Sequence, residues 1–212
     1  MYKKVTAILL RAKDLRDYDK SVHLFSAEEG LIIATMRGVR RATAKLKFAC
    51  QPFAFCEYEL SSKGNGYIVT GANTMGDFFS ISASPEKYFA GMLVCEAIEN
   101  CAVSADSATL FIVMAKTLKA VVLSKGNLCL ILAKFLQKLL SVGGFLLPID
   151  RALKPDTPDG LLSKIAMMTM DEVELWQENK ELSRSALRFM LNQFERETES
   201  KLKSKKLFLE IV

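Results

Sequence analysis

The residues between Met36 and Cys50 include five basic side chains and no acidic one. The five are Arg37, Arg40, Arg41, Lys45 and Lys47. Cations at this density complement a nucleic-acid backbone, because each neutralised phosphate releases condensed counterions and so adds affinity. A loop that only keeps a protein soluble usually mixes charges of both signs, since like charges repel. The stretch therefore predicts a nucleic-acid contact, with an ordinary solvated loop as the alternative.

Aromatic side chains near this stretch could stack on bases. Phe48 lies inside it and is the best candidate. The others are expected to fill a core instead, and they are Phe53, Phe55, Tyr58 and Tyr67. Strand alternation would place Phe53 and Phe55 on the face opposite Tyr58.

A second basic cluster lies near the C-terminus, in the segment KLKSKK. It contains Lys201, Lys203, Lys205 and Lys206. These lysines could form a second phosphate-binding surface. Alternatively, they are cations at a frayed helix end, where they interact favourably with the helix dipole.

Motifs of catalysis and metal binding are missing from the sequence. The one histidine, His23, has no metal-ligand spacing around it, and there is no Walker, G-x-S-x-G, H-E-x-x-H or G-x-G-x-x-G motif. Asp14, Asp17 and Asp19 are spaced like the start of a calcium loop, but basic and apolar residues follow where more oxygen ligands are needed, so a solvated turn is predicted. The five cysteines form no C-x-x-C pair, which predicts buried, reduced thiols. We expect no enzyme, no metal site and no cofactor.

Composition is typical of a globular protein with a buried core, because 50% of the 212 residues are hydrophobic. The net charge of +5 is moderate, so the position of the charges matters more than their sum. The longest apolar segment, residues 107–123, is interrupted by two lysines, and the N-terminus has no signal-peptide cleavage site. We expect a cytoplasmic protein without membrane contact.

Residues 1–80 contain short apolar runs separated by turn residues, which predicts five β-strands. The runs cover residues 5–10, 21–25, 31–36, 53–60 and 66–72. Glycines at positions 30, 64 and 66 supply the backbone freedom that hairpin turns need. Because five short antiparallel strands cannot bury an open face alone, we expect them to close into an OB-type barrel. The basic stretch would then connect the third strand to the fourth, beside the usual binding face.

From Ser84 and Pro85 onward the apolar residues recur with a helical period, which predicts an all-α bundle of five or six helices. The fold is thus expected to be α+β, with a five-stranded OB-type barrel domain over 1–80 and a helical bundle domain over 81–212. A connector rich in proline and aspartate is expected at 148–160. The predicted helices cover residues 86–102, 107–124, 127–144, 161–168, 171–178 and 183–200.

Several of these motifs occur together in a known order. A turn that ends in Gly30 is followed by a strand, the stretch RGVRR over 37–41 and the tripeptide QPF over 51–53. This order resembles the N-terminal domain of the RecO family of bacterial DNA repair proteins. PEKYFAGMLVCEAIE is similar to the helix that follows the barrel in that family, and ALRFMLNQFERETESKLKSKKLFLEI is similar to its last helix and ending. Many members carry a four-cysteine zinc module near residues 143–160, but no cysteine follows Cys129 here, so we expect a member that lacks it.

The resemblance implies a nucleoid-associated recombination mediator that hydrolyses no nucleotide. Such proteins bind single- and double-stranded DNA, anneal complementary strands and, with their partner RecR, help to load RecA onto strands coated by single-strand-binding protein. The basic stretch, Phe48 and the C-terminal lysines are then candidate DNA contacts. The resemblance also implies a groove in the helical domain for the acidic, hydrophobic tail of single-strand-binding protein. Its candidate cations are Lys125, Lys134 and Lys138, which as solvent-facing lysines would otherwise need no special role.

Two other classes of function stay open on the sequence. An RNA-binding OB protein would show a similar barrel and basic loop, and discrimination of the 2′-hydroxyl would separate it from a DNA-binding protein. A protein–protein adaptor would use the same cations against an acidic partner. An enzyme with an unrecognised site would be revealed only by turnover.

Overall fold

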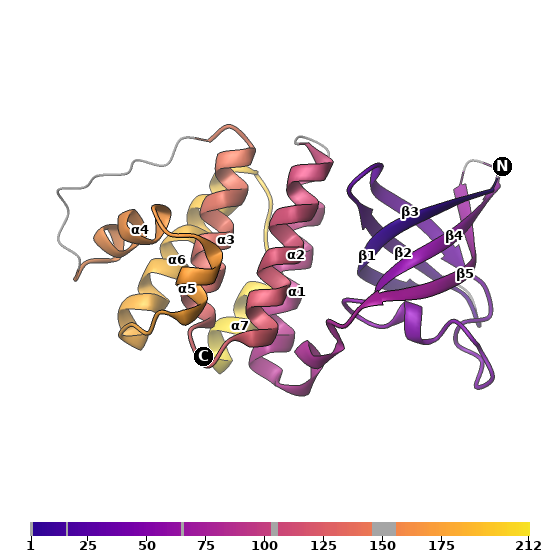
Figure 1. The fold of residues 1–212 in the computed structure, drawn as a ribbon, viewed down its shortest axis with the longest axis horizontal. Helices are drawn as coiled ribbons and strands as arrows, with labels where there is room; N and C mark the ends of the chain where they lie inside the picture. Colours follow the sequence, from indigo (N-terminus) through magenta and orange to yellow (C-terminus); the bar gives the residue numbers. More distant parts are fainter. Residues whose placement is uncertain (1, 16, 65, 103–105, 146–155) are drawn as a thin grey trace. The chain divides into compact units, whose positions relative to one another are not determined.

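The computed structural model describes residues 2–15, 17–64, 66–102, 106–145 and 156–212. The chain divides into two compact units, Met1–Ser82 and Ala83–Val212. The first unit contains the β-strands and the second contains the α-helices (Figure 1). Within these residues no helix combines the length and the apolar character that crossing a membrane requires.

The five strands of the first unit close into a barrel (Figure 1). They are β1 (Tyr2–Asp14), β2 (Lys20–Ser26), β3 (Gly30–Met36), β4 (Phe55–Lys63) and β5 (Gly66–Gly76). The order around the barrel is β1-β2-β3-β5-β4, with β4 pairing back onto β1. The β3–β5 pair is parallel and the other pairs are antiparallel. The predicted OB-type barrel is confirmed.

Strand β1 is much longer than the predicted 5–10. Its first half pairs with β4 and its second half with β2, so polar residues at both ends are held by ladder hydrogen bonds. The register with β2 shifts between Leu9 and Arg11, where a bulge lets the strand bend from one neighbour to the other. The apolar pattern indicates only the centre of such a strand.

The barrel core contains every second residue of the strands, as the pleat requires. In β1 the inward residues are Val5, Ala7 and Leu9, and they meet Val22 and Leu24 of β2. The largest side chain of this core is that of Tyr58, which is fully buried.

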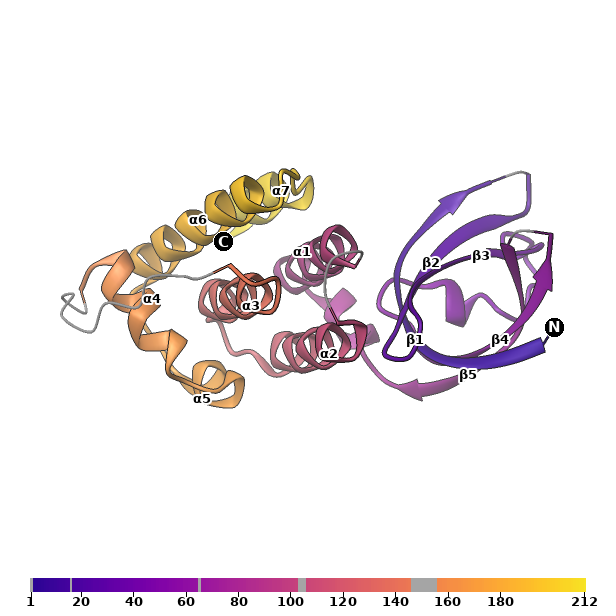
Figure 2. The ribbon, with the colours of Figure 1, turned by 90° about the horizontal axis from the view of Figure 1, so that it is seen from above.

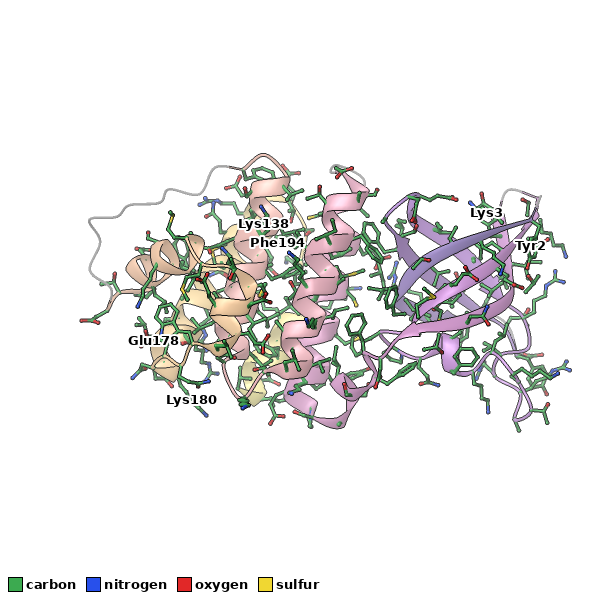
Figure 3. All side chains as sticks on the ribbon, viewed as in Figure 1. Tyr2, Lys3, Lys138, Glu178, Lys180 and Phe194 are labelled. Atoms are coloured by element: carbon green, nitrogen blue, oxygen red, sulfur yellow. The ribbon has the colours of Figure 1, made fainter. Side chains whose placement is uncertain are left out.

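The second unit consists of helices packed around α3 (Figure 2). The helices are α1 (Pro85–Cys101), α2 (Ser107–Leu123), α3 (Leu128–Val142), α4 (Pro158–Ala166), α5 (Met170–Leu175), α6 (Lys180–Glu197) and α7 (Ser204–Ile211). Helix α3 contacts α1, α2, α4, α5 and α6, and α7 packs on α1. Phe194 of α6 is fully buried (Figure 3). The predicted helical bundle is confirmed.

Side chains cap the N-termini of α1 and α2. The Ser84 hydroxyl accepts a hydrogen bond from Lys87 N at 3.5 Å, with Pro85 at the first helical position. The Asp106 carboxylate accepts one from Thr109 N at 2.9 Å. Such side-chain acceptors satisfy N–H groups that have no partner within the helix.

The start of α4 differs from the prediction. The helix begins at Pro158, inside the predicted connector 148–160, because Thr157 caps it by accepting a hydrogen bond from Gly160 N at 3.1 Å. Residues 146–155, which make up most of that connector and of the expected position of the zinc module, lie outside the described residues.

The C-terminal segment also differs, since the described residues form seven helices instead of five or six. Helix α6 ends at Glu197, and Lys201 to Lys206 form the turn and first residues of α7, so they are not a frayed end of the preceding helix. The carboxylate of Glu96 in α1 accepts hydrogen bonds from Lys203 N (2.8 Å), Ser204 N (3.0 Å) and Ser204 Oγ (2.7 Å). This cap comes from a residue about a hundred positions away, so no local pattern indicates it.

The five cysteines are free, with four of them buried and Cys129 partly exposed. Burial raises the pKa of Cys95 to about 12 and the pKa values of Cys101 and Cys129 to about 11. The thiolate is the reactive form of cysteine, so a raised pKa leaves very little of it near neutral pH.

We therefore expect slow modification of the native protein by a thiol reagent such as DTNB at pH 8. Cys129 should react first, because it alone is partly exposed, and all five thiols should react after unfolding in guanidinium. The time course of absorbance at 412 nm checks this, with Cys129→Ser as the control that removes the earliest phase. Rapid labelling of several thiols in the folded protein would contradict the buried positions.

Candidate nucleic-acid interface

The connection from β3 to β4 carries the predicted cations. Residues 37–47, called the basic loop from here on, form consecutive turns that lead into a short 3₁₀ helix, Phe48–Cys50. All five basic side chains are exposed. The first turn is closed by Arg41 N, which donates to Gly38 O at 3.0 Å, and it requires φ of 61° at Gly38. Glycine adopts this left-handed conformation at little cost.

The end of the basic loop is anchored in the barrel core. Val39, Ala49 and Cys50 are buried with the inward strand residues. The Tyr58 hydroxyl donates a hydrogen bond to Ala49 O at 2.9 Å. Phe53 then turns the chain into β4 with φ of 64°, which is why this strand begins at Phe55 and not at 53 as predicted. The loop is therefore a fixed part of the barrel surface.

We expect Tyr58→Phe to lower the free energy of unfolding of the barrel by about 1–2 kcal/mol, because the buried Ala49 carbonyl loses its hydroxyl donor. Hydrogen-exchange mass spectrometry of β4 peptides in increasing urea measures this local stability. Tyr18→Phe is the matched control, since it removes an exposed hydroxyl and should change stability by less than about 0.5 kcal/mol. Equal stability of the two variants would show that the anchor is unimportant.

The β1–β2 loop lies directly against the basic loop. Asp19 Oδ1 accepts a hydrogen bond from Gly38 N at 2.7 Å, and Tyr18 O accepts one from Arg40 N at 3.1 Å. Arg40 Nη1 lies 3.3 Å from Asp14 Oδ2. The spacing of these aspartates predicts a separate solvated turn, and the basic stretch contains no acid of its own. In space, acids and cations of the two loops share one surface, which corrects that view.

Two shallow concavities mark this shared surface. One has a volume of about 430 Å³ and is lined by Asp17, Tyr18, Asp19, Arg37, Gly38 and Arg41. The other has a volume of about 390 Å³ and is lined by Asp14, Lys20, Val39, Arg40, Lys47, Cys50 and Gln51. Both combine carboxylates with cations.

The five cations differ in their availability to a ligand. Arg40 pairs with Asp14, and the Arg41 guanidinium lies 4.8 Å from the centre of the Tyr18 ring. Lys47 Nζ donates to Ala42 O at 3.2 Å, a contact that leaves its charge unbalanced. Within the described part of the chain, Arg37 and Lys45 have no carboxylate partner. Arg37, Lys45 and Lys47 are therefore the best placed to bind phosphates.

The predicted aromatic candidates differ in their exposure to solvent. Phe48 is 37% exposed, whereas Tyr58 and Phe53 are fully buried. Phe55 stacks on Phe78, and Tyr67 accepts a hydrogen bond from Lys3 Nζ at 3.0 Å.

Tyr18 is a further exposed aromatic residue that the sequence did not predict as a candidate, and it is 51% exposed in the β1–β2 loop. An aromatic residue inside the polar turn RDYDK was a signal that could have indicated it.

Comparison with known proteins shows which proteins this barrel is similar to. Residues 1–78 match the family model described as "Recombination protein O N terminal". The barrel of this chain is thus similar to the N-terminal domain of RecO proteins. The chain is 26% identical over 142 residues to the DNA repair protein RecO of a Nocardioides species, a match that covers 66% of this chain and 58% of the relative. It is 27% identical over 95 residues to the DNA repair protein RecO of Clostridium novyi, covering 45% and 37%. The chain thus matches about half the length, or less, of these RecO relatives.

The remaining candidates lie in the helical unit, beyond the part matched by the RecO N-terminal model. Lys201 and Lys203 are exposed in the turn before α7. Lys205 Nζ instead donates to Glu195 Oε2 and Asn192 Oδ1, both at 2.8 Å, and Lys206 lies 3.8 Å from Glu210. Lys205 and Lys206 are therefore partly balanced by acids.

A groove lies between α6 and α7, and its lining contains none of the lysines predicted for the partner-binding groove. It has a volume of about 440 Å³ and a largely apolar lining with several cations. The lining residues are Arg184, Arg188, Leu202, Lys205, Lys206, Leu209 and Glu210. The two arginines lie four positions apart on α6, a spacing that puts them on one helix face.

The three predicted partner-binding lysines have different surroundings. Lys125 is exposed in the turn between α2 and α3, and Lys138 is exposed on α3 (Figure 3). Lys134 is half-buried and donates to Ala166 O, the last carbonyl of α4, at 3.0 Å. Burial lowers the pKa of Lys134, and the nearby charge of Lys138 lowers it further. Lys134 thus joins α3 to α4, which leaves Lys125 and Lys138 as the accessible pair.

Proposed function

We propose that this protein is a non-enzymatic DNA-binding mediator of recombinational repair. Its barrel binds the backbone of single and double strands through Arg37, Lys45 and Lys47. The observation that carries the proposal is that these three exposed cations, on a fixed loop of an OB-type barrel, have no acidic partner among the residues that the structure describes. Similarity of the barrel to the RecO N-terminal domain, and of the chain to proteins named DNA repair protein RecO, supports it.

Strand annealing follows from the same charges. Two complementary strands repel each other, so a protein that anneals them has to neutralise both polyanions at short range. The basic loop supplies one surface. The second is the C-terminal basic turn with the exposed Lys201 and Lys203, to which Lys205 and Lys206 add charge once DNA competes with their acidic neighbours.

We further propose that the helical unit binds proteins. The partners are a RecR-type mediator and the acidic, hydrophobic tail of single-strand-binding protein, with RecA reached indirectly when it is loaded on the coated strand. The surface around Lys125 and Lys138 supports the tail contact, and the α6–α7 groove offers a second place with an apolar lining and cations. A peptide with carboxylates and large apolar residues complements such surfaces. In the cell the protein would be associated with the nucleoid.

The test of the DNA-binding proposal uses the wild-type protein. Fluorescence anisotropy of a labelled 30-nucleotide single strand is followed at several salt concentrations, together with the matching duplex and an RNA of the same sequence. The same protein is then added to two complementary strands, and annealing is followed by energy transfer between dyes. We expect sub-micromolar binding at 50 mM salt, a steep loss of affinity with salt and faster annealing.

The alternatives give different results. A strong preference for the RNA strand would favour the RNA-binding class, because only a contact to the 2′-hydroxyl distinguishes the two backbones at one site. Binding weaker than micromolar to every nucleic acid would overturn the proposal and favour a protein–protein adaptor.

A further inference from the structure

Tyr18 has an unusual position for an aromatic side chain. It lies in the β1–β2 loop with 51% of its surface exposed. Its backbone is nevertheless held firmly, because Tyr18 O accepts Arg40 N at 3.1 Å, and the next residue, Asp19, binds Gly38 N through its carboxylate and Leu15 N through its carbonyl. An exposed ring on a fixed backbone loses little entropy when a ligand covers it.

Arg41 lies over the same ring. Its guanidinium carbon is 4.8 Å from the ring centroid, within the range of a cation–π contact. This contact restrains the ring and also presents a second planar group. Nucleobases stack both on aromatic rings and on arginine planes. Tyr18 and Arg41 together therefore offer flat surfaces, at the edge of the basic loop, on which a base can stack.

The walls of the adjoining concavity carry charges of both signs. Its volume is about 430 Å³, and its lining includes the acids Asp17 and Asp19 together with Arg37 and Arg41. A phosphate would be repelled by the two acids. A nucleobase is neutral, and its edges carry both donors for carboxylates and acceptors for arginine. The mixed lining therefore fits a base better than a phosphate.

We propose that Tyr18 and Arg41 form a stacking site for one unpaired nucleobase of a strand whose phosphates lie on Lys45 and Lys47, outside this concavity. This inference rests on the proposed DNA binding and makes it more specific. A base inside a duplex is already stacked and paired, so it cannot enter the site without being extruded. The site thus gives the barrel a preference for single strands that its cations alone would not provide.

The test compares Tyr18→Ala with Tyr18→Phe and with Tyr2→Ala. Tyr2 is a matched control, because it is 57% exposed at the far end of β1 (Figure 3). Stacking contributes to affinity without releasing counterions. We expect Tyr18→Ala to weaken single-strand binding by about 5- to 150-fold, the range measured for the loss of one stacked base. The salt slope and the affinity for duplex DNA should change little, and Tyr18→Phe and Tyr2→Ala should bind like the wild type.

A fluorescent base analogue, 2-aminopurine, placed in the single strand reports stacking directly. Its emission should be quenched by the wild type and recover with Tyr18→Ala, while circular dichroism shows that the variant is folded. If the wild type binds single strands but Tyr18→Ala binds equally well, the stacking site is wrong and the DNA-binding proposal stands. A parallel loss of duplex affinity and salt slope would also overturn the site, because the effect would then be electrostatic. If the wild type binds no DNA, both proposals fail together.

Discussion

Replacing Arg37, Lys45 and Lys47 together by alanine should abolish most of the affinity for single-stranded DNA. Each phosphate contact on a single strand contributes about 0.7 to the slope of log K against log salt, so three lost contacts should lower the slope by about 2. If the affinity extrapolated to 1 M salt is unchanged, binding weakens about 500-fold at 50 mM salt and about 30-fold at 200 mM. The expected loss is therefore largest in dilute salt.

These three residues are chosen because their exposed side chains have no carboxylate partner within the described residues. Arg40 and Arg41 are left in place, since Arg40 pairs with Asp14 and Arg41 lies over Tyr18. Changing them would disturb the shape of the loop as well as its charge. In a variant that keeps this shape, a change in the salt slope reports only the lost phosphate contacts.

The matched control removes the same charge elsewhere. Lys116, Lys119 and Lys180 are exposed residues of the helical unit and lie outside every candidate site. Their triple alanine variant should bind single strands with nearly the wild-type salt slope. Circular dichroism should show both triple variants folded, because exposed substitutions of this kind change stability by about 0.5 kcal/mol or less each. If the two variants lose affinity equally, net charge and not the basic loop attracts the DNA.

The barrel could be predicted from the sequence because the patterns that indicate its strands and turns are local. Alternation of apolar residues with period two follows from the pleat, and the turn at Gly30 adopts φ of 66°, which glycine tolerates. The caps at Ser84 and Asp106 are equally local, since a capping side chain lies within three residues of the N–H that it accepts from. Closure into a barrel then follows from the need to cover the strand edges.

Contacts between residues that are far apart in the chain could not be predicted from the sequence. The pairing of Arg40 with Asp14 depends on how two loops meet at one end of the barrel, and no spacing in the sequence encodes it. Helix α7 depends on Glu96 in the same way. Lys134 was predicted to face solvent. In the structure it is half-buried and donates a hydrogen bond to Ala166 O of α4. The sequence therefore predicted which loop carries the cations, but not the acids that lie beside them.

Asn127 shows how strongly one such distant contact can hold the helical unit together. It is 6% exposed at the start of α3. Its Nδ2 donates to Val173 O (2.6 Å), Glu174 O (2.9 Å) and Trp176 O (2.8 Å), and its Oδ1 accepts from Ser124 Oγ at 3.0 Å. One amide thus ties the α2–α3 turn to the end of α5.

We expect Asn127→Asp to lower the free energy of unfolding of the helical unit by about 3–5 kcal/mol, the usual cost of leaving a buried charge without a partner. The change keeps the shape of the side chain but replaces its N–H donors with an oxygen that faces three carbonyl oxygens. Urea unfolding followed by the fluorescence of Trp176, the single tryptophan of the chain, measures the effect next to the site. Asn100→Asp is the matched control: this exposed side chain donates to Ser200 Oγ at 2.9 Å, and after the change the Ser200 hydroxyl can donate to the carboxylate instead.

The loss should also depend on pH with a definite sign. Burial and the facing carbonyl groups disfavour the charged form of the introduced carboxyl group, so its pKa in the folded state lies above the value of about 3.9 in the unfolded chain. The unfolded state then ionises first as the pH rises, and stability falls from pH 4 towards neutrality. Below that range the protonated group can still donate one hydrogen bond, so the difference from wild type should shrink. A loss that is the same at pH 4.5 and pH 7.5 would show that the missing donor, and not the buried charge, determines the cost.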